Sequence, residues 1–279
     1  MASRPFAIIA GVGPGTGAAL ARRFAQSYPV ALLARNPSNY DSLVTEINNS
    51  GGRAIGIATD VSSGEDVRRA ISQIETELGG GGSGGNGQGA EGKKVGCAAA
   101  VFNASGQFFR KGLLDLTEEE FTAGYEVSCK GAFLFSQAVL PLLLRRAEET
   151  SNASTTTTTT SNNNKSDSTP SYPPTLIYTG ATASVKASAL MSSFATGKWA
   201  MRALAQSVAR EFAPKGIHVA HAIIDGVIDI PRTKEWLKDQ PAEAKISAEG
   251  IAEAYWNLHA QPVTAFTNEI DVRPMLEKW

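Results

Sequence analysis

The feature that most constrains the fold of this chain is a glycine-rich turn close to its start. Four glycines in seven residues, Gly11, Gly13, Gly15 and Gly17, separate a short apolar run from an Ala- and Leu-rich helical pattern. Glycine lets the backbone turn tightly and approach a ligand, and the first amides of a helix present the positive end of its dipole. A buried strand, a glycine turn and a helix start, in this order, predict a phosphate-binding site.

After the turn, short apolar runs alternate with amphipathic stretches along the whole chain. Continuous apolar runs are typical of strands that a parallel sheet covers on both faces, and a 3.6-residue period indicates helices. The alternation predicts an α/β fold, a Rossmann-type doubly wound and mostly parallel sheet with helices on both faces. Ser38 and Thr117 stand where N-caps are expected. Strands are expected over 5–10, 30–34, 53–58, 95–102, 175–179, 217–224 and 266–272, and helices over 16–27, 38–48, 65–78, 117–146, 193–213, 232–238 and 248–259.

Two stretches interrupt this pattern. Residues 79–94 are rich in Gly and Ser and nearly free of apolar side chains, which predicts a flexible surface insertion. Residues 147–174 contain six consecutive threonines and many Ser and Asn residues. Such a segment buries too little apolar surface to offset its ordering entropy, so disorder is expected. The chain is otherwise predicted to form a single domain over residues 1–279.

Composition excludes several classes of function. A net charge of −1 gives no basic surplus for nucleic acid or anionic membranes. The only apolar run before the first glycine, Phe6–Ala10, is too short for a signal-peptide core or a membrane span. The two cysteines, Cys97 and Cys129, lack metal-binding spacing and fit a reducing compartment. His218 and His221 face opposite sides of one strand and cannot share a metal, so no metal site is predicted. We therefore expect a soluble cytoplasmic protein.

Four markers stand in register along the chain: Gly11-x3-Gly15-x-Gly17, Asp60-Val61, Asn103-Ala104-Ser105-Gly106, and Lys198 on an Ala-rich helix. In this order they resemble the short-chain dehydrogenase/reductase family over nearly the whole length, apart from the two insertions. The resemblance implies a sheet of about seven strands and a bound nicotinamide dinucleotide. It further implies that Gly11, Gly15 and Gly17 bind the pyrophosphate, Asp60 and Val61 hold the adenine, Asn103 borders the cofactor through its backbone, and Lys198 holds the nicotinamide ribose.

The end of the second expected strand indicates which dinucleotide is bound. An acidic residue at this point of a βαβ nucleotide fold accepts hydrogen bonds from the ribose 2′-hydroxyl and selects NAD. Here the strand ends Ala34-Arg35-Asn36, without a carboxylate. Arg35 can pair with a 2′-phosphate and stack on the adenine, which favours NADP(H). The alternative is that Arg35 is a solvated charge at a strand end.

The catalytic positions depart from the family pattern. That pattern pairs a tyrosine with a lysine four residues later, where the phenol transfers a proton as hydride moves. Here the lysine is Lys198, but the tyrosine position is Phe194. The family's serine, thirteen residues earlier, is replaced by Ala181, and its asparagine by Ser128.

Two other side chains are candidates for the missing proton chemistry. Thr182 is the hydroxyl nearest in sequence to the lost serine, and its alternative role is packing or a turn hydrogen bond. Asp225 replaces the proline of the family's Pro-Gly segment, and its alternative role is a loop hydrogen bond. An iminium ion or a conjugated alkene needs little proton donation at the hydride step. The candidate catalytic residues are therefore Lys198, Thr182 and Asp225.

The sequence thus predicts an NADP(H)-dependent, short-chain-type oxidoreductase that acts on a small organic substrate without the usual tyrosine. Two alternatives stay open: an NADP(H)-binding sensor or scaffold without catalysis, and a non-redox isomerase, dehydratase or cyclase that reuses the pocket. The resemblance also implies a homodimer or homotetramer built on the two long helices expected over 117–146 and 193–213.

Overall fold

The computed structural model describes residues 4–80, 94–157 and 171–278. Its centre is the predicted doubly wound sheet, with seven strands in the order β3-β2-β1-β4-β5-β6-β9 and every pair parallel. The expected fold class is therefore confirmed. The strands are β1 (Phe6–Ala10), β2 (Val30–Ala34), β3 (Ala54–Ala58), β4 (Cys97–Phe102), β5 (Thr175–Thr179), β6 (His218–Ile224) and β9 (Glu269–Val272).

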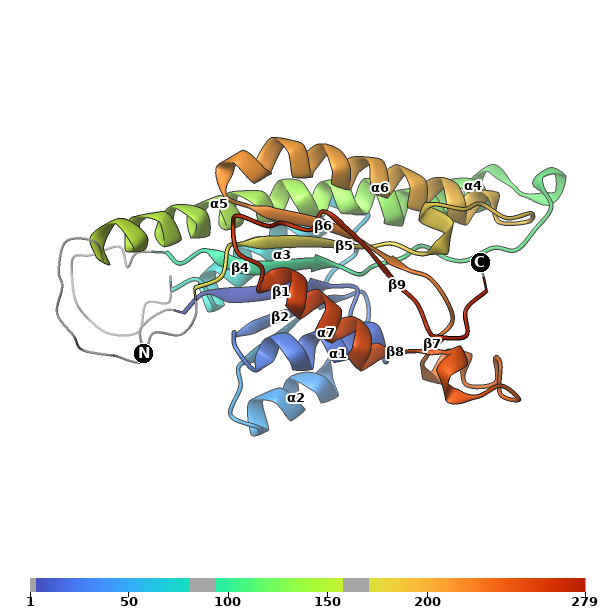
Figure 1. The fold of residues 1–279 in the computed structure, drawn as a ribbon, viewed down its shortest axis with the longest axis horizontal. Coiled ribbons are helices and arrows are strands. Elements are labelled where there is room, and N and C mark those ends of the chain that lie inside the picture. The colour runs from blue at the N-terminus through green and yellow to red at the C-terminus, as the bar shows by residue number, and fades with distance from the viewer. Residues whose placement is uncertain (1–3, 81–93, 158–170, 279) are drawn as a thin grey trace.

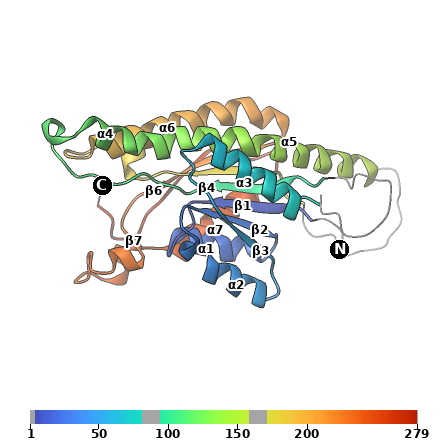
Figure 2. The ribbon, with the colours of Figure 1, turned by 180° about the vertical axis from the view of Figure 1, so that it is seen from behind.

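Helices cover both faces of this sheet (Figures 1 and 2). One face carries α3 (Gly64–Glu77), α4 (Glu118–Tyr125), α5 (Gly131–Thr157) and α6 (Ser192–Phe212), and the other carries α1 (Thr16–Ala25), α2 (Asp41–Asn49) and α7 (Ala248–His259). Each face has its own apolar core. Because the strand order reverses between β1 and β4, a crevice opens at their carboxyl ends, where ligands of such sheets bind.

A small two-stranded sheet, β7 (Ile228–Asp229) and β8 (Ile246–Ser247), lies beyond the end of β6. It stands at the same side of the molecule as the C-terminus (Figure 1). The segment between its strands is where a helix over 232–238 is expected, and that expectation is wrong. The segment forms two 3-10 turns instead, Pro231–Thr233 and Ala242–Ala244. The Lys245 ammonium bonds the carbonyls of Thr233 and Lys234, and Leu237 is left-handed at φ 52°, so the helical turn does not continue.

Ser38 is not the cap of α2, which begins at Asp41 after a 3-10 turn. The residue at the cap position is Tyr40, whose side chain is buried. Its ring covers Gly56 of β3 so closely that a Cβ there would lie 2.1 Å from the ring. Packing of this ring on the sheet delays the start of the helix by three residues.

Thr117 does cap a helix, as predicted. Its hydroxyl accepts from the amide of Glu120 and the Glu120 carboxylate accepts from the amide of Thr117, each at 3.2 Å. The single helix expected over 117–146 is wrong in its middle, where the π-helical turn Glu126–Lys130 separates α4 from α5. Such turns occur often at functional sites.

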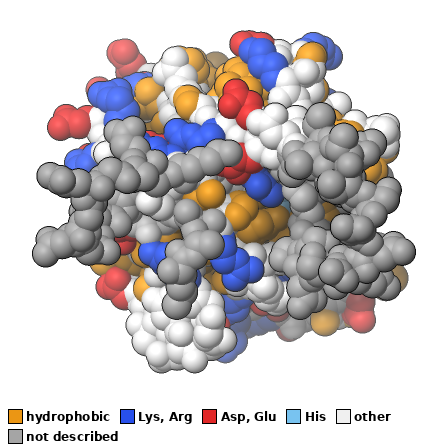
Figure 3. Space-filling view, turned by 90° about the vertical axis from the view of Figure 1, so that its left-hand side faces the viewer, with side chains coloured by type: hydrophobic (Ala, Val, Ile, Leu, Met, Phe, Trp, Pro, Cys, Tyr) orange, Lys and Arg blue, Asp and Glu red, His pale blue; other side chains and the backbone are white. Residues whose placement is uncertain are grey.

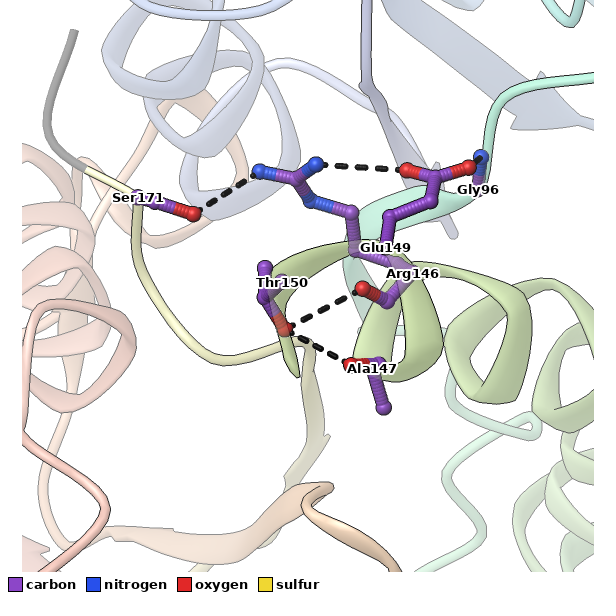
Figure 4. A network of polar contacts seen from close by, with 6 residues as sticks. All are labelled: Gly96, Arg146, Ala147, Glu149, Thr150 and Ser171. Atoms are coloured by element: carbon purple, nitrogen blue, oxygen red, sulfur yellow. Dashed lines mark hydrogen bonds and ion pairs between the residues drawn. The ribbon is translucent and has the colours of Figure 1, made fainter. Parts of the chain in front are cut away.

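The expected end of that helix at Arg146 is also wrong, because α5 continues to Thr157. Figure 4 shows what holds the extra turns. Arg146 pairs with Glu149 at 3.2 Å, and Glu149 accepts from the Gly96 amide at 2.9 Å, just before β4. Arg146 also donates to Ser171. The expected disorder is thus wrong for 147–157, which are helical. Residues 171–174 have no regular secondary structure. Residues 158–170 lie outside the described residues, as does most of the flexible segment expected at 79–94.

The ends of α3 and α5 lie at the amino ends of the strands, opposite the crevice (Figure 1). On this face basic and acidic side chains are mixed among apolar ones (Figure 3). An open hollow of about 660 Å³ lies here, between the end of α1 and the start of β3. None of the predicted site residues lines it.

Candidate functional site

The glycine turn between β1 and α1 depends on its glycines for close packing. Gly11 has φ 88°, and a Cβ there would lie 2.4 Å from the amide nitrogen of Ala104. A Cβ on Gly17 would lie 2.7 Å from the carbonyl oxygen of Gly11. The Asn103 side-chain amide donates to that same carbonyl at 2.9 Å. Asn103 therefore holds the turn against the end of β4, a role that sequence reasoning did not assign to its side chain.

The same turn leaves room and donors for an anion. No side chain caps α1, and a Cβ built on Gly13 meets nothing within 4 Å. The first amides of a helix have no acceptor within the helix itself. Gly15 has φ 135°, and the side chain of Ile230, from the segment after β7, packs directly over it. These features fit a dinucleotide pyrophosphate bound at the start of α1.

Arg35, Asp60 and Val61 lie together at the carboxyl ends of β2 and β3. The Asp60 carboxylate accepts from the Ser62 hydroxyl at 2.6 Å and the Ser62 amide at 2.9 Å. These bonds and the charge of Arg35 lower the pKa of Asp60, against the opposing effect of burial. Arg35 is exposed, and Val61 packs against Gly131 at the start of α5. An exposed guanidinium is thus available beside the predicted adenine position.

Lys198 is buried between α6 and the sheet, with 3% of its surface exposed. Its ammonium donates to the carbonyl of Thr179, at the end of β5, at 2.9 Å. Burial lowers the pKa of Lys198 to about 8. The Phe194 ring lies one helical turn away, 5.8 Å from the Lys198 nitrogen, and packs edge-on against Phe108 at 5.3 Å. An aromatic wall therefore stands where the family places its tyrosine.

Thr182 and Asp225 are brought together by the sheet. The Thr182 hydroxyl donates to Asp225 Oδ1 at 2.5 Å, and Arg273, just after β9, pairs with Asp225 Oδ2 at 2.8 Å. Sequence reasoning considered Thr182 and Asp225 one by one and missed Arg273. The sequence contains the terminal Arg273-Pro274 pair and Asp225-Gly226, but it does not show that these two segments lie side by side.

Other polar groups near the site have mainly structural partners. Tyr178 points toward α5 and shares a 2.6 Å hydrogen bond with Ser136. His221 bonds Glu269 at 3.0 Å, and burial lowers its pKa to about 4. The Ser128 hydroxyl, in the π-helical turn, is buried without a hydrogen-bond partner among the described residues. Within the described part of the chain, no group of three or more His, Cys, Asp or Glu side chains is placed to hold a metal ion.

Comparisons with known proteins agree with this architecture. Residues 5–82 match the family model described as short chain dehydrogenase. The chain is 23% identical over 270 residues to an uncharacterised oxidoreductase of Staphylococcus epidermidis, covering 96% of each chain. It is 26% identical to a short-chain dehydrogenase from Rhodopseudomonas palustris, with a TM-score of 0.68 over 96% of this chain and 98% of that one.

A metagenomic short-chain oxidoreductase in complex with NADP has the same fold, with a TM-score of 0.70, 20% identity and coverage of 98% of this chain and 99% of that one. The family-model match is confined to residues 5–82, whereas the similarity to the two solved structures extends the same fold over nearly the whole chain.

Proposed function

We propose that this protein is an NADP(H)-dependent oxidoreductase that acts on a small organic substrate without a tyrosine proton relay. The observation that carries the proposal is the uncapped start of α1, with open space at Gly13 and a buried lysine on α6 that bonds the end of β5. When bound, the cofactor would supply or accept a hydride at its nicotinamide ring. Gly11, Gly15 and Gly17 would hold its pyrophosphate, and Lys198 its ribose.

Selection of NADP(H) over NAD(H) rests on Arg35. Its guanidinium is exposed at the end of β2, where an NAD-selecting fold carries a carboxylate. A 2′-phosphate can form a charge-assisted hydrogen bond with this guanidinium. The NADP in the metagenomic oxidoreductase is consistent with this choice.

We expect Arg35→Ala to weaken NADPH binding by about 10- to 100-fold and to change NADH binding little, since a hydrogen bond to a charged group contributes about 1.5–3 kcal/mol. Fluorescence titration of both nucleotides measures the two dissociation constants. Arg22→Ala is the matched control, because Arg22 of α1 is also exposed but already pairs with Glu46 of α2. If Arg35→Ala weakens NADPH and NADH binding by the same factor, Arg35 does not select between the two cofactors.

The absence of a phenol at position 194 limits the chemistry. General acid–base catalysis contributes about 10²- to 10⁴-fold in rate, so we expect the wild-type protein to reduce simple ketones poorly. Phe194→Tyr would place a phenol beside the Lys198 ammonium. We expect this variant to gain ketone reduction by about 10²-fold or more if only the acid is missing.

The measurement is NADPH consumption by both proteins against a panel of ketones, imines and enones. Turnover of activated imines or enones by the wild type supports the proposal. Tight NADPH binding with no turnover by the wild type on any substrate would instead favour a sensor or scaffold. Conversion that is indifferent to the redox state of the cofactor would favour an isomerase, dehydratase or cyclase.

A further inference from the structure

Three side chains from distant parts of the chain form one connected group at the carboxyl edge of the sheet. Thr182 follows β5, Asp225 follows β6 and Arg273 follows β9. Both Asp225 oxygens have partners, the Thr182 hydroxyl at 2.5 Å and the Arg273 guanidinium at 2.8 Å. Asp225 is buried, with 8% of its surface exposed, whereas Thr182 is partly exposed. A ligand entering this edge therefore meets Thr182 and not Asp225.

The direction of the first hydrogen bond follows from charge. Asp225 is ion-paired with Arg273, and an ionised carboxylate accepts hydrogen bonds but has no hydrogen to donate. The hydroxyl hydrogen of Thr182 is therefore committed to Asp225. What Thr182 offers to a ligand is its oxygen lone pairs alone.

The C-terminal segment fixes Arg273 in this position through contacts within the protein. Arg273 also pairs with Asp271 at 2.6 Å. The next residue, Pro274, packs over Gly226, where a Cβ would lie 2.8 Å from the proline ring. Farther along, the amide of Leu276 donates to the carbonyl of Glu243, beyond β7. These contacts hold the Arg273 guanidinium against Asp225.

We propose that Arg273 is a positioning residue that, through Asp225, makes Thr182 a hydrogen-bond acceptor, so that the site prefers a substrate whose reacting group carries a hydrogen. An alcohol or an N–H group can donate to Thr182, whereas the oxygen of a ketone or aldehyde cannot. The placement of substrate beside Thr182 rests on the proposed function.

The test compares equilibrium binding of a matched pair of probes, 1-phenylethanol and acetophenone, to the full-length protein with no nucleotide added. Ligand-observed NMR gives both dissociation constants without turnover. The wild type is expected to bind the alcohol about three- to tenfold more tightly than the ketone, the effect of one net hydrogen bond. Asp225→Asn reverses this ratio, because the new amide can donate to Thr182 and free its hydrogen for the ketone.

The variants of Arg273 separate positioning from simple support of the fold. Arg273→Gln is expected to bring the ratio close to one, and Arg273→Lys to restore most of it, since an ammonium can still pair with Asp225. If Arg273 only supports the fold, its substitution weakens the binding of both probes equally and leaves the ratio of their dissociation constants unchanged. Thr182→Val removes the preference, whereas the control Thr45→Val, on α2, keeps it.

Equal binding of the two probes by the wild type, or binding of neither, would overturn the proposal. So would an unchanged ratio in Asp225→Asn with a native circular dichroism spectrum. NADPH titration is run separately on the same proteins. If the protein does not bind NADPH, the proposed function is wrong. The ratio of the two probes' dissociation constants is measured without nucleotide and still tests the role of Arg273.

Discussion

Lys198 is the buried cation on which the predicted ribose contact depends, and its burial has a consequence for stability. The pKa of this lysine falls from 10.5 to about 8 in the folded protein. Below pH 8 the ammonium is charged in both the folded and the unfolded chain, and folding carries the full cost of burying it. Between about pH 8 and 10.5 the unfolded chain binds more protons, so this cost is relieved as the pH rises.

We therefore expect the unfolding free energy of the wild type, relative to Lys198→Met, to increase by about 2–3 kcal/mol between pH 7 and pH 10. Urea unfolding of both proteins without nucleotide measures the difference. Lys130→Met is a control, because Lys130 is exposed and pairs with Glu126. Parallel curves for the wild type and Lys198→Met would show that Lys198 keeps an ordinary pKa in the fold.

At the scale of elements, the β1–α1 turn makes different demands on its glycines. Gly11→Ala places a side chain at φ 88° and against the backbone of Ala104, and we expect it to cost at least about 1–3 kcal/mol of stability from the backbone alone. Gly13→Ala meets open space and is expected to change stability by less than about 0.5 kcal/mol.

Thermal unfolding and NADPH titration of the two variants distinguish packing from ligand contact. If the space at Gly13 belongs to the pyrophosphate, Gly13→Ala weakens NADPH binding while its unfolding free energy stays that of the wild type. A large loss of stability in Gly13→Ala, or none in Gly11→Ala, would contradict this account of the turn.

Elements whose signals are local could be predicted from the sequence. The glycine turn is marked by the spacing of its own glycines, and the Thr117 capping box forms between residues three apart. The extension of α5 to Thr157 could not be predicted, because it is held by Glu149 bonding Gly96 across the sheet edge. The Thr182–Asp225–Arg273 group could not be predicted either, since it forms only where three strands end side by side.

For the whole molecule, the adjacent helices α4, α5 and α6 present a surface that a single chain leaves uncovered (Figure 1). Each of the three helices carries at least one half-exposed aromatic side chain, with 38–44% of its surface exposed: Phe121, Tyr125, Phe133 and Trp199. The stretch Glu118–Asn152 is also long and apolar enough to cross a membrane, although half of its most apolar window is buried within the protein.

Exposed aromatic side chains such as these four mark association surfaces when they lie together. We propose that a second copy of the chain covers it.

Glutamates placed at this surface test the proposal. An unpaired charge buried in an apolar interface costs several kcal/mol, so we expect Phe133→Glu combined with Trp199→Glu to weaken self-association by about 100-fold or more. Sedimentation velocity without detergent should show the wild type as a dimer or tetramer and the double variant as a monomer. Trp236→Glu is the control, because Trp236 is 52% exposed but lies between β7 and β8, away from these helices. A monomeric wild type would show that no second copy covers this surface. A wild type that stays in solution only with detergent would favour contact with a membrane.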